Sequence, residues 1–261
     1  MKHYALIGEK LGHSMSVPIH EAIFRKLGID ADYRLVEISR EHFARDVRHL
    51  MAEVDGFNVT IPYKQDVMLL LDAIDPAARE IGAVNTVVTG EKNLGYNTDT
   101  FGIAAMLRHY GMDPAGKPCY VLGSGGTSHT TCATLRRMGA ASVTVVSRSP
   151  GEGQISYEQL AEEFTGILIN TTPAGMWPKV QGCPIDPAVL PSMLRRAQGV
   201  ADVIYNPPET VLTAAARAAG IPACTGMYML IDQAVEAERL WQGYDMPQGL
   251  TGELMKELKL L

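Results

Sequence analysis

Short apolar runs alternate along the chain with longer segments in which apolar residues recur at helical spacing. In the first part of the sequence the predicted strands are 3–8, 33–38, 55–62 and 83–89, and the predicted helices are 17–29 and 64–74. Alternation of this kind is typical of βαβ units built around a largely parallel sheet. The pattern therefore predicts an α/β protein.

A second series of strands and helices follows. An apolar strand at 119–122 runs into a glycine-rich turn and then a helix, and a β-branched strand follows at 142–147. Further parallel strands are predicted at 166–170 and 201–206. The last predicted helix, at 229–243, can return to pack on the first series of elements.

The length of the chain supports a division into two domains. Its 261 residues exceed the ~100–150 residues of a typical single domain. We place the two crossings near Gly102 and Gly226. One predicted domain consists of residues 1–102 plus 227–261, and the other, inserted into it, consists of residues 103–226.

Composition narrows the classes of function. Lys and Arg total 23 against 29 Asp and Glu, a net charge of −6, and the absence of a basic run disfavours nucleic-acid binding. No stretch of about 18 apolar residues occurs, and the N-terminal apolar stretch is too short for a signal peptide, so we expect a cytoplasmic protein without a membrane partner. The four cysteines form no C-x-x-C pair, which predicts reduced thiols and no metal site.

The glycine-rich turn GSGGTS, Gly123–Ser128, is a variant of the G-x-G-x-x-G pattern. Glycines at these positions let the backbone approach a pyrophosphate, and the following helix presents free N–H groups to its charge. A strand precedes the turn, a helix follows it, and a second strand ends about 20 residues later. This context favours a dinucleotide site over a tight turn without a ligand.

The second strand of this unit ends in Ser147, Arg148 and Ser149. An NAD-specific unit normally carries Asp or Glu here to bind the ribose 2′-hydroxyl, whereas an arginine flanked by hydroxyls can bind a 2′-phosphate. The sequence therefore favours NADP. If Arg148 is only a solvated surface residue, the choice of cofactor stays open.

Polar residues gather in the loops of the first half. The stretch NVTIPYK ends on Lys64, and other clusters contain Ser14 and Ser16, Asn85, and Asp99. Hydroxyls, amides, a carboxylate and an ammonium suit a small polyhydroxylated substrate if they converge. Taken singly, each has a local explanation: a helix N-cap for a serine or Asp99, a turn for Asn85, and a solvated charge for Lys64.

Together these segments resemble the shikimate dehydrogenase family. HSMS is similar to its Ser-x-Ser substrate motif, NVTIPYK to its catalytic-lysine segment, AVNT and NTDTFG to its asparagine and aspartate segments, and GSGGTS to its nucleotide loop. VIYNP is similar to its tyrosine loop and GMYMLIDQA to its C-terminal glutamine segment. The matches keep the family order from about residue 5 to about residue 243, which is nearly the whole chain.

The resemblance implies a role for individual residues. Lys64 is the expected general acid and base, with Asp99 as its partner. The expected substrate-binding residues are Ser14, Ser16, Thr60, Asn85, Tyr205 and Gln233. The expected NADP-binding residues are Gly123, Gly125, Gly126, Thr127, Ser147, Arg148 and Met229.

The resemblance also implies an architecture and a reaction. The expected protein has an N-terminal α/β substrate domain, an inserted Rossmann-like NADP-binding domain, and an active site in the interdomain cleft. The expected enzyme, a monomer or homodimer of aromatic amino acid biosynthesis, reversibly reduces 3-dehydroshikimate to shikimate with NADPH. A quinate or dual quinate/shikimate dehydrogenase is the nearest alternative, and a non-catalytic NADP or shikimate sensor is a more distant one. The presence of both Lys64 and Asp99 favours a catalyst over a sensor.

A few positions depart from the family pattern. His129 stands where an arginine or lysine is frequent behind the glycine loop, so NADP binding is expected to be weaker at neutral pH. Val17 separates Ser16 from the proline that usually follows it, and Glu21 replaces a frequent asparagine. His20 has no acid or nucleophile at a telling spacing, and no chemistry is assigned to it.

Overall fold

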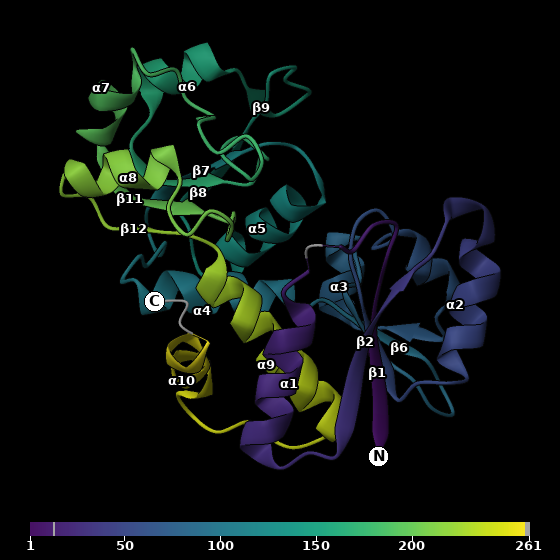
Figure 1. Cartoon of the computed structure of the whole chain (residues 1–261). Helices are drawn as coiled ribbons and strands as arrows, with labels where there is room; N and C mark the ends of the chain where they lie inside the picture. Colours follow the sequence, from purple (N-terminus) through teal and green to yellow (C-terminus); the bar gives the residue numbers. More distant parts are fainter. Residues whose placement is uncertain (13, 259–261) are drawn as a thin grey trace. The chain divides into compact units, whose positions relative to one another are not determined.

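The computed structural model describes residues 1–12 and 14–258. Backbone contacts divide the chain into two compact units (Figure 1). Unit 1 consists of Met1–Asp99 and Ile231–Leu261, and unit 2 consists of Thr100–Leu230. The boundaries predicted after residues 102 and 226 differ slightly from these, because the chain changes unit within two helices, α4 and α9, and not in loops.

Unit 1 is an α/β unit with a mixed sheet in the order β2-β1-β3-β5-β6-β4. Its strands are β1 (Lys2–Gly8), β2 (Ala31–Glu37), β3 (Gly56–Val59), β4 (Ala73–Ile74), β5 (Thr86–Val88) and β6 (Leu94–Tyr96). Its helices are α1 (Ser16–Leu27), α2 (Phe43–Met51), α3 (Pro76–Ile81), α10 (Leu250–Glu257), and the greater part of α9 (Met227–Gln242), with 3₁₀ turns η1 (Arg40–His42) and η2 (Asp66–Leu70). β1 pairs in parallel with β2 and β3, whereas β5 runs antiparallel to β3 and β6.

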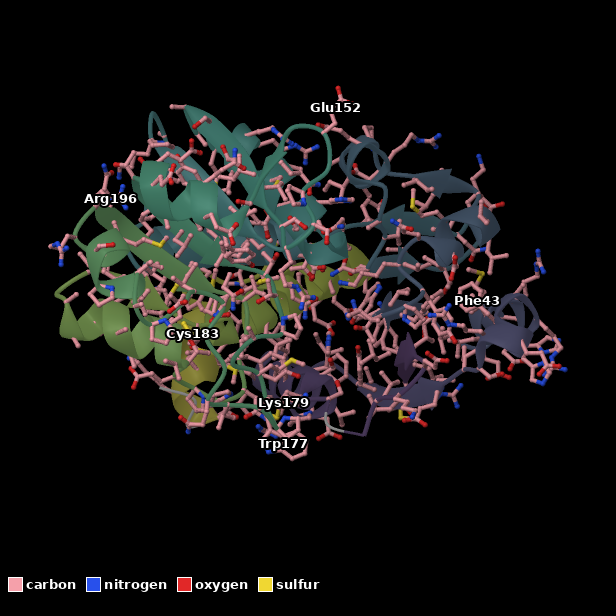
Figure 2. All side chains as sticks on the ribbon, turned by 90° about the horizontal axis from the view of Figure 1, so that it is seen from above. Phe43, Glu152, Trp177, Lys179, Cys183 and Arg196 are labelled. Atoms are coloured by element: carbon pink, nitrogen blue, oxygen red, sulfur yellow. The ribbon has the colours of Figure 1, made fainter. Side chains whose placement is uncertain are left out.

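Both faces of the unit 1 sheet are covered. Side chains alternate along β1, so that Ala5 and Ile7 join one apolar cluster, and Tyr4 and Leu6 join another. The first cluster includes side chains of α2, among them Phe43, which is labelled in Figure 2. The second includes side chains of α1 and α9, which come from opposite ends of the sequence and lie on the same side of the sheet (Figure 1).

Unit 2 is a doubly wound parallel unit with strand order β12-β11-β10-β7-β8-β9. Its strands are β7 (Pro118–Leu122), β8 (Ser142–Val146), β9 (Gln154–Ile155), β10 (Gly166–Asn170), β11 (Ala197–Asp202) and β12 (Ala223–Cys224). Its helices are α5 (Gly126–Arg137), α6 (Tyr157–Glu163), α7 (Leu190–Leu194), α8 (Val211–Ala218), and α4 (Asp99–His109) apart from its first residue. The chain runs outward from β7 in one direction and then from β10 in the other. The junction of β7 and β10 is therefore the topological switch point, where open α/β sheets bind ligands.

The α/β class predicted from the sequence is confirmed, and two predicted elements differ from the structure. The strand predicted at 201–206 lies earlier in the chain, as β11 (Ala197–Asp202). The apolar stretch at 64–74 forms the 3₁₀ turn η2 and the short strand β4, not a helix. Val67 is buried, but Leu69 is 87% exposed, so this run has no continuous apolar face to pack as a helix. Asp72 and Ala73 instead donate backbone hydrogen bonds to Asn93 O, which brings the chain beside β6.

Candidate active site

Lys64 is held by the backbone of the turn that follows β3. Tyr63 N donates to Thr60 O at 3.0 Å, and the carbonyl of Lys64 itself accepts from Val84 N at 2.8 Å. The ring of Tyr63 is buried and stacks on Phe43, with 4.4 Å between ring centroids. These contacts fix the position from which the lysine side chain extends. The sequence alone shows a lysine after a strand and does not reveal these contacts.

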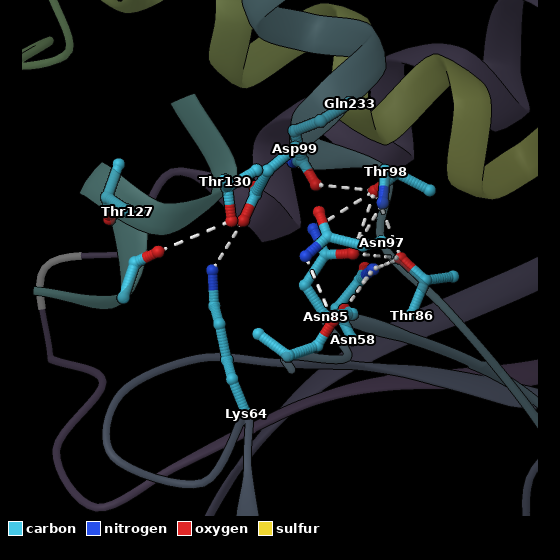
Figure 3. A network of polar contacts seen from close by, with 12 residues as sticks. Asn58, Lys64, Asn85, Thr86, Asn97, Thr98, Asp99, Thr127, Thr130 and Gln233 are labelled. Atoms are coloured by element: carbon cyan, nitrogen blue, oxygen red, sulfur yellow. Dashed lines mark hydrogen bonds and ion pairs between the residues drawn. The ribbon is translucent and has the colours of Figure 1, made fainter. Parts of the chain in front are cut away.

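The ammonium of Lys64 contacts the carboxylate of Asp99, the first residue of α4. Lys64 Nζ donates to Asp99 Oδ2 at 2.6 Å, as Figure 3 shows. The two side chains are 25% and 12% exposed, so the pair is largely removed from water but retains an open side. A short charge-assisted bond in such surroundings orients the ammonium and keeps its protons directed. The structure thus brings together the two residues predicted for proton transfer.

The amide of Asn85 supports the turn that carries Asp99. Its Oδ1 accepts from Thr98 N at 2.7 Å, and its Nδ2 donates to Thr98 Oγ1 at 3.1 Å. Thr98 Oγ1 also donates to Gln233 Oε1 at 3.3 Å, which links α9 to the same turn (Figure 3). Asn85 and Gln233, predicted to bind substrate, therefore meet through Thr98. Sequence reasoning gave Thr98 no role of its own, and its only signal was its place beside Asp99.

Ser14 and Ser16 bond to each other at the start of α1. Ser14 Oγ donates to Ser16 Oγ at 3.1 Å and accepts from Ser16 N at 3.2 Å. Within the described part of the chain the N-cap residue is Met15 and makes no side-chain capping bond, so neither serine caps the helix as the local explanation required. Thr60 lies at the end of β3, where its N donates to Ile7 O at 2.9 Å. All three residues belong to unit 1.

A chain of polar contacts joins Ser16 to Asn85 through Tyr33 and Asn58. Burial raises the pKa of Tyr33 well above its usual value, the carboxylate of Glu238 raises it further, and a hydrogen bond with Ser16 lowers it. Tyr33 OH donates to Asn58 Oδ1 at 2.7 Å. Asn58 Nδ2 in turn donates to Asn85 O at 3.2 Å and Thr86 Oγ1 at 3.0 Å. The contacts run without a break from the serines to Asn85, whose amide holds the turn before Asp99.

In unit 2 the predicted nucleotide turn joins β7 to α5. Gly123 has a positive φ of 102°, and a Cβ there would meet the side chains of Thr171 and Thr172 at 3.1 Å. Gly125 is the N-cap of α5, and Gly126 and Thr127 begin the helix. Among the described residues no side chain caps this helix, and none comes within 4 Å of a Cβ built at Gly125 or Gly126. Free N–H groups and open space over the turn fit a phosphate group of a dinucleotide.

The remaining predicted cofactor residues lie at other points of unit 2. Ser147 forms a tight turn in which its Oγ donates to Ser149 O at 3.2 Å, and Arg148 at the tip is exposed. Tyr205 follows β11, and burial raises its pKa. Met229 is 8% exposed and packs in the apolar cluster that also contains Val121.

The sequence of the chain was compared with those of known proteins. The model of the shikimate dehydrogenase substrate binding domain matches residues 6–87. A curated relative from Clostridium beijerinckii, named shikimate dehydrogenase (NADP(+)), is 37% identical over 262 residues, which cover 96% of each chain. The chain belongs to the shikimate dehydrogenase family. The family predicted from the motifs is therefore confirmed.

Solved structures of family members agree with the fold. A chorismate mutase/shikimate 5-dehydrogenase fusion protein from Clostridium acetobutylicum has a TM-score of 0.94 and 37% identity, over 99% of this chain and 97% of that chain. Shikimate 5-dehydrogenase from Thermus thermophilus, in complex with NADP(H) and shikimate, has a TM-score of 0.86 and 27% identity, over the whole of both chains. Resemblance to the shikimate dehydrogenases thus extends over both units.

Asp202, at the end of β11, is a site-building residue that sequence reasoning missed. It is fully buried, its Oδ1 accepts from Asn170 Nδ2 and Ile204 N at 3.0 Å, and its Oδ2 accepts from Thr210 Oγ1 at 2.9 Å. These bonds tie together the loops at the carboxyl ends of β10 and β11, including the segment that carries Tyr205. Burial raises the pKa of Asp202 to about 6. The sequence offered one signal for Asp202, a carboxylate in the mainly apolar predicted strand at 201–206.

In the ranges 1–12 and 14–258, no group of three or more His, Cys, Asp or Glu could hold a metal ion. Across the same residues, no helix combines the length and apolar character needed to cross a membrane.

Proposed function

We propose that this chain is an NADP-dependent shikimate dehydrogenase that reversibly reduces 3-dehydroshikimate to shikimate. The contact between Lys64 Nζ and Asp99 Oδ2 at 2.6 Å carries the proposal, because carbonyl reduction requires a proton donor at the oxygen that becomes a hydroxyl. The names of the relatives, with NADP(+) as the cofactor, support the same reaction. The resemblance also implies a place in aromatic amino acid biosynthesis and in the cytoplasm, and we include both in the proposal.

The residues of unit 1 account for binding and proton transfer. Lys64 donates a proton from Nζ to the substrate oxygen during reduction and accepts it back during oxidation. Asp99 holds the ammonium through Oδ2, and its other carboxylate oxygen can accept a hydrogen bond from a substrate hydroxyl. Ser14, Ser16, Thr60, Asn85 and Gln233 are proposed to bind the carboxylate and hydroxyls, with Tyr205 from unit 2 as a further contact.

The residues of unit 2 are proposed to hold NADP. When bound, the cofactor supplies the hydride to the carbonyl carbon of the substrate. Gly123, Gly125, Gly126 and Thr127 offer the uncapped start of α5 to the pyrophosphate. Ser147 and Arg148 stand at the end of β8, where the 2′-phosphate is read, and Met229 is the proposed neighbour of the nicotinamide.

A spectrophotometric assay of NADPH formation tests the proposal. Shikimate and quinate are each offered with NADP and with NAD. We expect kcat/KM to favour shikimate over quinate by at least about tenfold, because polar groups that bind a substrate hydroxyl are left unpaired by the wrong ligand. Equal values for the two substrates would make the chain a dual quinate/shikimate dehydrogenase. No NADPH with either substrate would overturn the proposed function.

The role of Lys64 is tested in the same assay. A positioned proton donor typically contributes ~100-fold to ~10,000-fold, so Lys64→Ala should lower kcat by that range and raise the KM for shikimate much less. Lys92→Ala, which removes an exposed lysine of the same unit, is the matched control and should behave as wild type. A Lys64→Ala enzyme with normal kcat would remove the lysine from the mechanism.

A further inference from the structure

His20 and Glu238 form a buried hydrogen-bonded pair between two helices that also carry proposed substrate contacts. His20 Nδ1 and Glu238 Oε1 lie 2.6 Å apart, and both side chains are 0% exposed. His20 is on α1 and Glu238 on α9. An ionised carboxylate can only accept a hydrogen bond, so Nδ1 carries the shared proton. The pair links α1 to α9, whose apolar side chains also pack in one cluster.

The imidazole of His20 is held by one hydrogen bond and by the rings of Phe24, Tyr33 and Trp241. Among the described residues His20 Nε2 has no hydrogen-bond partner, so the orientation of the ring depends on Glu238 and on stacking. The second carboxylate oxygen of Glu238 accepts from Gln242 Nε2 at 2.9 Å, and Gln242 Nε2 also donates to Tyr4 OH at 3.1 Å. Glu238 is thereby fixed on its own side, and the imidazole takes its orientation from it.

Two routes connect this pair to Ser16. Ser16 lies four residues before His20 on α1, and residues at this spacing share one helix face. The His20 ring also stacks on the ring of Tyr33, with 4.0 Å between centroids and 7° between planes. The hydrogen bond with Ser16 lowers the pKa of this same Tyr33, and the phenol donates to Asn58 Oδ1 at 2.7 Å. A rotated imidazole would displace the phenol beside the serine.

We propose that the buried His20–Glu238 pair positions Ser16 in the substrate pocket by fixing α1 against α9 and by supporting Tyr33. His20 and Glu238 are positioning residues, since neither is among the residues proposed to contact substrate. A buried polar pair contributes little net stability compared with apolar residues of the same volume, so the value of this pair lies in its directed bond. The inference rests on the proposed function, because it assumes that Ser16 binds shikimate.

Two variants separate positioning from stability. Glu238→Gln keeps the shape of the side chain but has one acceptor oxygen in place of two, so His20 Nδ1 and Gln242 Nε2 cannot both keep their bonds to it. The double variant His20→Phe with Glu238→Leu replaces the pair by apolar groups, which restores packing and keeps an aromatic ring on Tyr33 but loses the directed bond. Arg25→Gln removes the exposed Arg25–Glu257 pair of the same α1 helix and is the matched control.

The expected result is a change in substrate affinity alone. Ser16 is proposed to bind the ground state and the transition state alike, so its displacement raises the KM for shikimate and leaves kcat nearly unchanged. Both variants should raise that KM by about fivefold to tenfold, the loss of about one hydrogen bond, with kcat and the KM for NADP within about twofold of wild type. Arg25→Gln should match wild type in all three quantities.

Two results would overturn the inference. One is a wild-type KM for shikimate in both variants, and the other is an equal rise in the KM values for shikimate and NADP, which indicates general loosening. If Glu238→Gln does not fold, the double variant decides by the same criteria. Failure of the proposed function is distinguished by the wild type, which would then form no NADPH from shikimate.

Discussion

Replacing Asp202 by asparagine should make the stability of the protein less dependent on pH. The Asp202 carboxylate is fully buried, and burial raises its pKa from an ordinary value of 3.8 to about 6, against the smaller opposing effect of hydrogen bonds from Ile204 N, Asn170 and Thr210. Asparagine has nearly the same shape. Its oxygen can keep the bonds from Asn170 and Ile204, and its amide nitrogen can donate to Thr210 Oγ1.

The magnitude follows from the two pKa values. Below about pH 4 the Asp202 side chain is protonated in both the folded and the unfolded protein. The contribution of its raised pKa to the free energy of unfolding is then fully present. As the pH rises from about 4 to about 7, the unfolded chain releases this proton first, so the free energy of unfolding falls. A difference of about two units corresponds to roughly 3 kcal/mol, at about 1.4 kcal/mol per unit. The asparagine of the variant cannot ionise, so the variant does not show this loss.

Urea unfolding followed by far-ultraviolet circular dichroism measures the effect. The free energy of unfolding of Asp202→Asn, minus that of wild type, should increase by up to roughly 3 kcal/mol between about pH 4.5 and about pH 7.5, at an unchanged m-value. Because the variant is compared with wild type at the same pH, the titration of the other carboxylates contributes equally to both and cancels. Asp186→Asn, which removes an exposed carboxylate of the same unit, controls for the loss of a negative charge.

A difference that stays constant with pH would refute the reasoning. If the variant were less stable than wild type by the same amount at every pH, then the hydrogen bonds of the carboxylate would balance its desolvation, and the pKa of Asp202 would be the same in the folded and the unfolded protein. If the difference decreased with rising pH, the sign of the pKa shift would be wrong.

Other substitutions test separate parts of the structure. Arg148→Ala should lower the preference for NADP over NAD in kcat/KM by about 10-fold to 100-fold, and an unchanged ratio would show that this exposed arginine does not read the 2′-phosphate. Gly56→Ala would place a methyl group against the indole of Trp241 and disturb the 2.9 Å bond from Trp241 Nε1 to Val87 O, so the Tm should fall by several degrees. Gly252→Ala is the control and should not lower the Tm, because no described atom lies within 4 Å of the new Cβ. Asp75→Ala removes the N-cap of α3 and should cost about 1 kcal/mol in urea unfolding.

The central strands of the doubly wound unit were the most predictable part of the fold. β7, β8 and β10 are short apolar runs, and the glycine-rich turn and helix after β7 agree with the expected pattern. The two-residue strands β9 and β12 gave no signal, and β11 begins four residues before the predicted strand. The stretch at 64–74 shows the limit of such signals. An apolar run of that length suits a helix or a buried strand, and the pairing of Asp72 and Ala73 with Asn93, distant in sequence, decided against a helix.

The candidate site was predictable where a motif names a residue and unpredictable where long-range contacts support it. Lys64 and Asp99 stand out in their segments, and the structure shows them 2.6 Å apart. Asn58 and Thr98 look like ordinary strand and turn residues. Their importance comes from bonds to Asn85, and no spacing in the sequence reveals which of several amides and hydroxyls will meet.

The two glutamates near the end of α9 show why that limit is physical. Glu236 and Glu238 are two residues apart in a segment that reads as a charged helix face. Glu236 bonds to Arg239, three residues away, which any helical wheel would suggest. Glu238 is instead fully buried, and its partner His20 lies 218 residues earlier in the chain. Burial of a carboxylate is tolerable only with a partner in place, and the packing of α1 against α9 supplies that partner. The sequence contains both residues but not the distance between them, so a buried pair that positions a substrate serine becomes visible only in the folded chain.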